Sequence, residues 1–328
     1  MGKEVLIFVS TNLLLRHQTH ATWPADPAHL RFPGSALARF LELRGRRVVR
    51  GCGAVWYAVP GRFLMSLPYQ SMLDPDPAEL SRLIRETHAF GARFPSVHWT
   101  GLESGLYVLR RRPYDIESVH AKHRPRVRKG MEKFHIRPAT ISDLMNQGRA
   151  LNLNTMERQK RFDREFGDKR RWETLVEAAF ACSEVSFPAA FVGNRMAAYM
   201  ITCQEQGWLH ILHQMSRQED LPNFPNHVLT FTVTQQAAND ESVEAICYGC
   251  VPLFAADGLH EYKLRFGYEL ESHHSAIHFH PAIRPMLDNP ITRSAVRCGR
   301  KLFPENQFLE TIDTVMKGAR SSRPPEKC

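Results

Sequence analysis

Three short β-forming runs, separated by two tight-turn dipeptides, are the feature that most constrains the fold of this chain. The runs are residues 189–192, 196–203 and 208–214. Gly193-Asn194 and Gln206-Gly207 stand between them, and each dipeptide suits a hairpin because Gly and Asn adopt the positive φ angles that tight turns require. The sequence therefore predicts a meander of three antiparallel strands in the second half of the chain.

The segments on either side of this meander give a distinctive order of helices and strands. Before it we predict a strand at 135–138, a helix at 142–159 with Ser142 as its N-cap, and a helix at 168–182. After it we predict a helix at 225–238, a buried strand at 243–248, a helix at 258–266 and an extended run at 268–279. The order β, α, α, β, β, β, α, β, α, β combines a meander with crossover helices, so the sheet must contain antiparallel and parallel pairs.

The first half of the chain contains fewer periodic segments. We predict a helix at 35–44, a hairpin of strands 54–59 and 62–67, a helix at 78–90, a strand at 106–109 and a basic, largely helical stretch at 116–134. Pro125 falls inside that stretch and predicts a helix boundary or kink. The apolar run 5–15 is too short to cross a bilayer and is expected to form a buried strand or helix. From Met316 onward we expect a disordered tail.

Composition limits the class of protein. A chain of 328 residues exceeds what one hydrophobic core usually serves, so two packed units are expected. Hydrophobic residues at 43% and charged residues at 23% are typical of a globular protein. The net charge of +9 is compatible with nucleic acid, an anionic membrane surface or an anionic small substrate as partner, and equally with solvated surface charge.

The cysteines indicate a reducing compartment. The seven cysteines are odd in number and scattered, which gives no disulfide framework. Cys247 and Cys250 form a lone CxxC at the end of an apolar run, followed by Pro252, which is a poor match to a redox or metal motif. Residues 5–15 lack the flanking features of a signal peptide. We therefore expect a cytoplasmic protein.

Four segments resemble the GNAT acyltransferases, and most closely their FemAB-like branch with its acetyltransferase relatives. They are Arg124–Met131 with the strand 135–138, the hairpin Phe191–Tyr199, the strand 208–216 with the helix start Pro225-Asn226, and Gly258–Gly267. The last contains Tyr262-Lys263-Leu-Arg-Phe266-Gly267, which is similar to the Phe-Lys-x-x-Phe-Gly segment of FemAB-like domains. The likeness covers about residues 105–280.

The resemblance implies an α/β fold with a GNAT-like mixed sheet flanked by helices. Because FemAB-like proteins pair two such domains, it also implies a partial, degenerate GNAT-like N-terminal half. We accordingly predict a partial N-terminal domain at 1–125, a GNAT-like acyltransferase domain at 126–285 and a C-terminal extension at 286–328. In a GNAT-like sheet the strand ending near Gln214 diverges from the strand starting near Val243.

The resemblance implies a transferase that moves an acyl group from acyl-CoA or acetyl-CoA to an amine of an unidentified acceptor by direct attack. No Ser-His-Asp or activated-Cys motif indicates a covalent intermediate. Residues 217–227 stand where most acetyl-CoA-dependent members have a glycine-rich pyrophosphate loop, but they contain no glycine and two prolines. Two alternatives therefore stay open, an aminoacyl-tRNA-dependent, peptidoglycan-type aminoacyl transferase and a non-catalytic binding module of the same fold.

The predicted catalytic residues are Lys263, Tyr248 and His213. Lys263 would neutralise a donor phosphate or the developing oxyanion, unless it is a surface lysine. Tyr248 would donate a proton to the leaving group, unless it only packs in its strand. His213 would be a base near neutral pH, unless it is a hydrogen-bonded sheet histidine. Strand alternation places it on the face opposite Gln214.

Donor binding is assigned to Arg217, Asn226 and Gln214. Arg217 could meet a phosphate just before the helix or remain a solvated loop residue, whereas Gln214 and Asn226 lie at the strand end and the helix start. The basic run 124–129 fits an anionic precursor acceptor, tRNA or a membrane surface, and equally a solvated helix face; DNA is not expected. The histidines 273, 274, 278 and 280 lack metal-ligand spacing, so no metal is expected.

Overall fold

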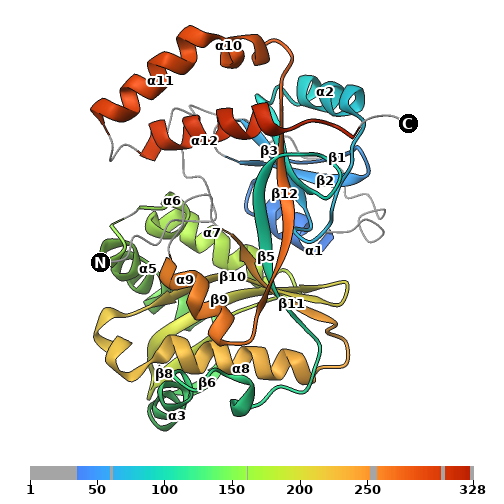
Figure 1. Cartoon of the computed structure of the whole chain (residues 1–328). Coiled ribbons are helices and arrows are strands. Elements are labelled where there is room, and N and C mark those ends of the chain that lie inside the picture. The colour runs from blue at the N-terminus through green and yellow to red at the C-terminus, as the bar shows by residue number, and fades with distance from the viewer. Residues whose placement is uncertain (1–34, 60–61, 161, 252–256, 304–306, 326–328) are drawn as a thin grey trace. The chain divides into compact units, whose positions relative to one another are not determined.

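The computed structural model describes residues 35–59, 62–160, 162–251, 257–303 and 307–325. The predicted apolar element at 5–15 lies outside them. Contacts divide the chain into two units, which are described separately (Figure 1). Among the described residues, unit 1 comprises Arg39–Gly45 and Leu106–Glu271, and unit 2 comprises 35–38, Arg46–Gly105 and 272–325. The predicted domain boundaries at 125 and 285 stay a prediction.

Unit 1 contains the mixed sheet that the sequence predicts, with helices on both faces. Its strands are β5 (Leu102–Arg110, of which unit 1 includes the part from Leu106), β6 (His135–Pro138), β7 (Val185–Ser186), β8 (Pro188–Val192), β9 (Arg195–Glu205), β10 (Trp208–Ser216) and β11 (Ala245–Cys250). Its helices are α3 (Arg124–Lys133), α4 (Ile141–Asp143), α5 (Arg149–Arg158), α6 (Arg164–Gly167), α7 (Lys169–Phe180), α8 (Pro225–Asn239) and α9 (Asp257–Arg265), with the short turns η2 (Ile116–Ser118), η3 (Leu144–Gly148, a π turn) and η4 (Gln218–Asn223). The strand order is β5-β11-β10-β9-β8-β6, with β7 on β9. Every pair is antiparallel except β10 with β11.

The helices of unit 1 cover the two faces of this sheet. The long helix α8 packs along β8 to β11 with α3 beside it, and α5 packs on β10 from the other face (Figure 1). Gly130 of α3 allows the close approach of α3 to α8, because a Cβ there would lie 2.8 Å from Val228 Cβ. The predicted helix boundary at Pro125 is confirmed, since Pro125 stands in the first turn of α3.

Unit 2 repeats the same kind of topology on a smaller scale. Its elements are β1 (Val48–Gly51), β2 (Ala54–Val59), β3 (Phe63–Leu67), α2 (Pro77–Glu86), β4 (Gly91–Ser96), β12 (Glu269–Phe279, from Ser272), α10 (Arg284–Asp288), α11 (Pro290–Leu302) and α12 (Gln307–Ser321), whereas α1 (Ser35–Leu43) contributes residues to both units. The order is β1-β2-β3-β4-β12, and only β3 with β4 is parallel. The predicted partial GNAT-like N-terminal half is confirmed at the level of topology.

Trp56, Phe94 and Trp99 form the centre of the core of unit 2. The rings of Trp56 and Phe94 meet edge to face at 5.9 Å, and those of Phe94 and Trp99 at 5.2 Å. Such pairs are worth about 0.5–1.5 kcal/mol beyond the burial of their area. Asp76 caps α2 by accepting from the backbone N–H groups of Ala78 and Glu79.

Two local predictions are wrong. The helix predicted at 142–159 is capped two residues earlier, because Thr140 and Asp143 form a capping box and Ser142 is not the cap. The predicted disordered tail is wrong for residues 316–321, which belong to α12. Met316 is 4% exposed, and Ser322 accepts a hydrogen bond from the backbone N of Ile277 at 2.8 Å. The polar and basic residues after Met316, with Pro324-Pro325, obscured the end of that helix.

Candidate functional site

The strands β10 and β11 separate after a short parallel ladder, as predicted. Within the described residues they pair only over Trp208–His210 and Ala245–Cys247. Beyond that point β10 stays on β9 as far as Ser216, and β11 stays on β5 as far as Cys250. The facing backbone groups in the split are therefore released from sheet pairing, which leaves them able to bind a carbonyl group.

Five polar side chains form a closed hydrogen-bond network at this split. They are Gln214 of β10, Tyr248 of β11, Asn226 and Thr230 of α8, and Tyr262 of α9. Tyr248 donates to Gln214 Oε1, and Gln214 Nε2 donates to Asn226 Oδ1 at 3.2 Å. The network joins four separate elements and fixes the direction of each side chain.

The protons of this network can be assigned. Tyr262 donates to the Asn226 carbonyl at 3.0 Å, and burial raises the pKa of Tyr262 well above its usual value. Since Tyr248 donates to Gln214, Thr230 has its own proton to give to Tyr262 at 2.9 Å or Tyr248 at 3.3 Å. Tyr248 is therefore held as a neutral phenol whose proton points along the end of β10.

Lys263 lies beside this network and is almost fully buried, with 2% of its surface exposed. Its ammonium is 4.2 Å from the centre of the Tyr107 ring and 5.1 Å from that of Tyr248. Aromatic faces attract a cation, and more so where water is excluded. The Tyr107 hydroxyl is in turn 2.8 Å from His260 Nδ1. A buried ammonium in this position can stabilise negative charge that develops in the split.

The structure brings together four of the six predicted site residues and leaves two apart. Lys263, Tyr248, Gln214 and Asn226 meet at the split. Arg217 points elsewhere, because its Nε donates to the Met196 carbonyl of β9 at 2.9 Å. The functional roles of all of them stay predictions.

His213 lies on the opposite face of the sheet from this cluster. The register between β9 and β10 shifts between Ile211 and His213, so Leu212 is an extra residue in β10. Such a bulge re-aims the side chains that follow it. Strand alternation correctly separates His213 from Gln214. It also places Gln214 on the face of His210, and that prediction is wrong because simple alternation ignores the bulge. The ring of His213 instead packs on Phe166 at 4.4 Å.

Sequence reasoning missed Thr230 and Tyr107. Thr230 stands four residues after Asn226, so the two share one face of α8. That spacing was the one signal that could have found it. Tyr107 comes from β5, far away in the sequence, and nothing local to it indicates a role. Only the pairing of β5 with β11 places it next to Lys263.

The loop between β10 and α8 has few free backbone donors. The N–H groups of Gln218, Asp220 and Phe224 donate within the protein, and positions 222 and 225 are prolines. Lys129 of α3 donates to the Pro222 carbonyl at 3.0 Å and lies 5.5 Å from the centre of the Phe224 ring. Arg126 lies 5.6 Å from the same ring. The helix start is therefore covered by an aromatic ring with two cations on it.

Two histidines adjoin the site: His123, which is buried and precedes α3, and His227 of α8, which is partly buried. The rings of His123 and His227 are 4.8 Å apart, and His227 lies 5.2 Å from the ring of Tyr262. Burial, with the nearby Arg126, lowers the pKa of His123 to about 4 and that of His227 to about 3. Both are neutral at pH 7.

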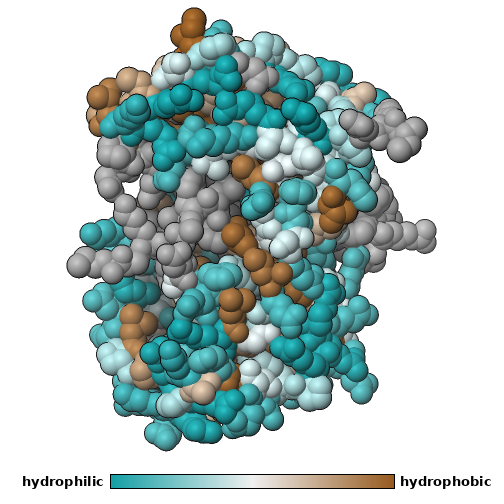
Figure 2. Space-filling model, in the orientation of Figure 1, coloured by the Kyte–Doolittle hydropathy of each residue, from teal (hydrophilic) through white to brown (hydrophobic). Residues whose placement is uncertain are grey.

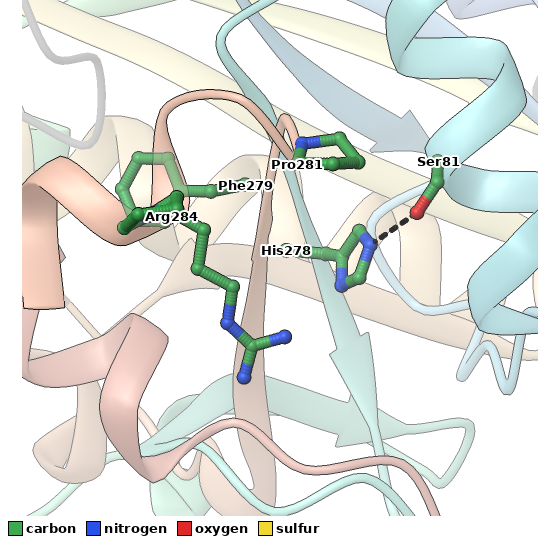
Figure 3. Close-up of a pocket in the computed structure, with 6 residues that line it drawn as sticks. Ser81, His278, Phe279, Pro281 and Arg284 are labelled. Atoms are coloured by element: carbon green, nitrogen blue, oxygen red, sulfur yellow. Dashed lines mark hydrogen bonds between the residues drawn. The ribbon is translucent and has the colours of Figure 1, made fainter.

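A pocket lies in unit 2, between α2 and the end of β12 (Figure 3). Ser81 and His278 face each other there at 2.8 Å. Ser81 donates its single proton to the Pro77 carbonyl at 2.7 Å, so His278 Nε2 must be the donor to Ser81. A histidine that donates to the serine cannot act as its base, so this pair does not form a nucleophilic dyad. Its geometry is that of a structural contact.

Among the described residues, no three or more His, Cys, Asp or Glu side chains gather where they could hold a metal ion. Within the same part of the chain, none of the helices has the length and apolar character needed to span a bilayer.

Comparison with known proteins places the fold. No protein-family model matches the sequence, and a search of curated proteins finds no match. The structure is similar to that of FemX, with a TM-score of 0.55 and 10% identity over 80% of this chain and 95% of FemX. It is also similar to L-PGS from Bacillus licheniformis, with a TM-score of 0.50 and 12% identity over 85% and 99% of the two chains.

At such identities the likeness shows the fold. The chain has a GNAT-like fold of the FemAB-like type, and the predicted resemblance is confirmed at that level.

Proposed function

We propose that unit 1 transfers an acyl group from an activated donor to an amine, with the reacting groups held in the split between β10 and β11. The observation that carries the proposal is the buried Lys263 beside Tyr248, at the place where the strands part. A buried cation next to a fixed phenol provides both charge stabilisation and a proton donor.

The reaction would proceed in one ternary complex. The neutral amine attacks the acyl carbonyl, a C–N bond forms, and the ammonium of Lys263 stabilises the oxyanion. The bond from the acyl carbon to the leaving group then breaks, and the leaving group takes the Tyr248 proton. The proton that the amine nitrogen loses restores the phenol. Gln214 and Asn226 keep the phenol in place through the hydrogen bonds described above.

We propose an aminoacyl-tRNA rather than acyl-CoA as the donor. The loop that would hold a CoA pyrophosphate has no glycine, and many of its backbone donors are used or missing. Arg126, Arg128 and Lys129 of α3 are exposed beside that loop and suit the phosphates of a nucleic acid. The FemAB-like resemblance is compatible with this donor, since some members of that branch use it.

Donor binding tests this choice directly. Filter binding with a pool of aminoacylated tRNA should detect binding. Calorimetry with coenzyme A should detect none. A double variant, Arg126→Glu with Lys129→Glu, should weaken tRNA binding and lower its salt dependence. The matched control is Lys169→Glu with Arg170→Glu, in the basic segment of α7, which should change neither. If the protein binds coenzyme A and not tRNA, the donor is an acyl-CoA thioester instead. If it binds neither, the result favours a non-catalytic binding module of the same fold.

A further inference from the structure

The helix α11 of unit 2 turns an apolar stripe toward solvent. Ile291, Ala295, Cys298 and Leu302 recur at spacings of four, three and four residues, which places them on one face of the helix. All four are exposed, Ile291 at 78% and Leu302 at 69%. Brown side chains at the two ends of α11 make this visible in Figure 2. In a helix that serves a core, such a stripe would face inward.

Residues of α11 outside this stripe pack on α12. A Cβ at Gly299 would lie 3.2 Å from Leu309, and Arg300 pairs with Asp313 at 2.8 Å. The contacts of α11 with the rest of the hairpin therefore use residues other than those of the stripe. Within the described residues of unit 2, the apolar stripe is left without a partner.

Basic side chains gather on the side of α11 that faces α12. A cavity of about 430 Å³ between α11 and α12 is lined by six cations: Arg293, Arg297, Arg300, Lys301, Lys317 and Arg320. Asp313 is the acidic residue that lines it. The sequence of α11 itself contains no acidic residue. At 100° per residue, Lys301 lies about 90° and Arg297 about 130° from the middle of the apolar stripe, and Arg293 and Arg300 lie opposite it.

We propose that α11, with its cationic flank, docks unit 2 on an anionic lipid bilayer. A helix with an exposed apolar face and a basic flank is suited to lie in the interface, with the apolar face among the acyl chains and the cations at the headgroups. Charge selects this occupant over a second copy of the chain, because pairing two stripes would bring together two helices that contain basic residues and no acidic one. A nucleic acid would leave the stripe uncovered.

Cosedimentation of the full chain with vesicles tests the proposal. Vesicles of phosphatidylcholine with about one third phosphatidylglycerol should bind the protein, and vesicles of phosphatidylcholine alone should bind it at least about tenfold more weakly. Ile291→Asp with Leu302→Asp should weaken binding to the anionic vesicles by about tenfold or more. Arg297→Glu with Lys301→Glu should do the same and remove its salt dependence.

The control is Val97→Asp, which changes an exposed apolar residue of unit 2 outside the hairpin and should bind vesicles as the parent does. Circular dichroism and donor binding should stay unchanged in every variant. Equal binding to both kinds of vesicle, or vesicle binding that the Ile291 and Leu302 changes leave intact, would overturn the proposal. A second result would also overturn it: the parent forms a dimer in solution that the Ile291 and Leu302 changes dissociate, and neither the parent nor any variant binds vesicles.

Discussion

Units 1 and 2 share one arrangement of strands and differ in the residues beyond the end of the parallel ladder. In each, three antiparallel strands are joined by one helix to a strand parallel to the third, β10 with β11 in unit 1 and β3 with β4 in unit 2. In each, the parallel ladder covers three residue pairs. The backbone that opens the split is therefore present in both.

The side chains past the ladder have different roles in the two units. In unit 1 they are Gln214 and Tyr248, which join a polar network beside a buried cation. In unit 2, β4 continues into Phe94, whose ring packs between Trp56 and Trp99. Ser96 lies two residues on, and its hydroxyl donates to Asp74 and accepts from the backbone of Trp99. The topology alone therefore does not make a site. Packed aromatic side chains occupy the end of the ladder in unit 2, whereas polar side chains and a buried cation occupy it in unit 1.

The largest expected effect on stability belongs to unit 2. Phe94→Ala should lower the free energy of unfolding by about 3–5 kcal/mol, because it removes a buried ring and leaves a cavity. Urea denaturation followed by fluorescence measures it. Donor binding by the folded fraction should be unchanged. A variant that keeps its stability, or that loses donor binding while folded, would break the comparison.

Tyr248→Phe should show the reverse pattern in unit 1. It removes one hydroxyl, so stability should change by about 1 kcal/mol, whereas acyl transfer should slow by about 100-fold or more because the leaving group loses its proton donor. Rates under single-turnover conditions, with denaturation of the same samples, separate the two effects. Tyr57→Phe, a buried tyrosine of β2 in unit 2, is the control and should leave the rate unchanged.

Acid should destabilise the surroundings of the site in unit 1. His123 has its pKa lowered to about 4 by burial and nearby arginines, against about 6.5 when unfolded. The unfolded chain then binds more protons between these values, so stability is complete above pH 6.5 and falls as the pH drops toward 4. At pH 5 the loss from His123 is about 2 kcal/mol.

Denaturation midpoints of the parent and of His123→Phe, measured at pH 7 and pH 5, test this. The variant should lose less stability between the two values than the parent does. Replacement of the exposed His98 by Phe, in unit 2, is the matched control. An equal pH dependence in the parent and in His123→Phe would contradict the assignment.

The smallest effect concerns a helix cap. Thr140→Ala removes the side chain that accepts from the backbone N of Asp143 and should cost about 1 kcal/mol. Ser142→Ala, two residues on, should cost less than about 0.5 kcal/mol because that residue is exposed and caps nothing. Thermal denaturation of the two variants is sufficient, and the opposite ranking would restore Ser142 as the cap.

The sequence predicted the meander, the crossover helices and the split because those features depend on local patterns. The turns at Gly193 and Gly207 have positive φ angles, as glycine allows, and they fix the hairpins. The strands β1 and β4, and the helices α10, α11 and α12, were not predicted, because their hydrophobic residues are few or broken by basic ones.

The site was predictable in part for the same reason. Lys263 and Tyr248 lie in segments with a recognisable pattern, and Gln214 and Asn226 flank the predicted connection. Gln214 was placed on the face of His210 because a one-residue bulge leaves no trace in the sequence pattern of β10. Tyr107 needed the pairing of β5 with β11, a contact between strands more than a hundred residues apart.

The measurement that tests the central claim most directly compares Lys263→Met with Lys169→Met. The first removes the buried ammonium beside Tyr248, and the second removes an exposed one on α7. With aminoacyl-tRNA as donor, Lys263→Met should lower the rate of acyl transfer by about 100-fold to 1,000-fold, as expected for loss of a group that stabilises the oxyanion. Lys169→Met should leave that rate unchanged. Equal rates for the two folded variants would contradict the placement of the active site at the split of unit 1.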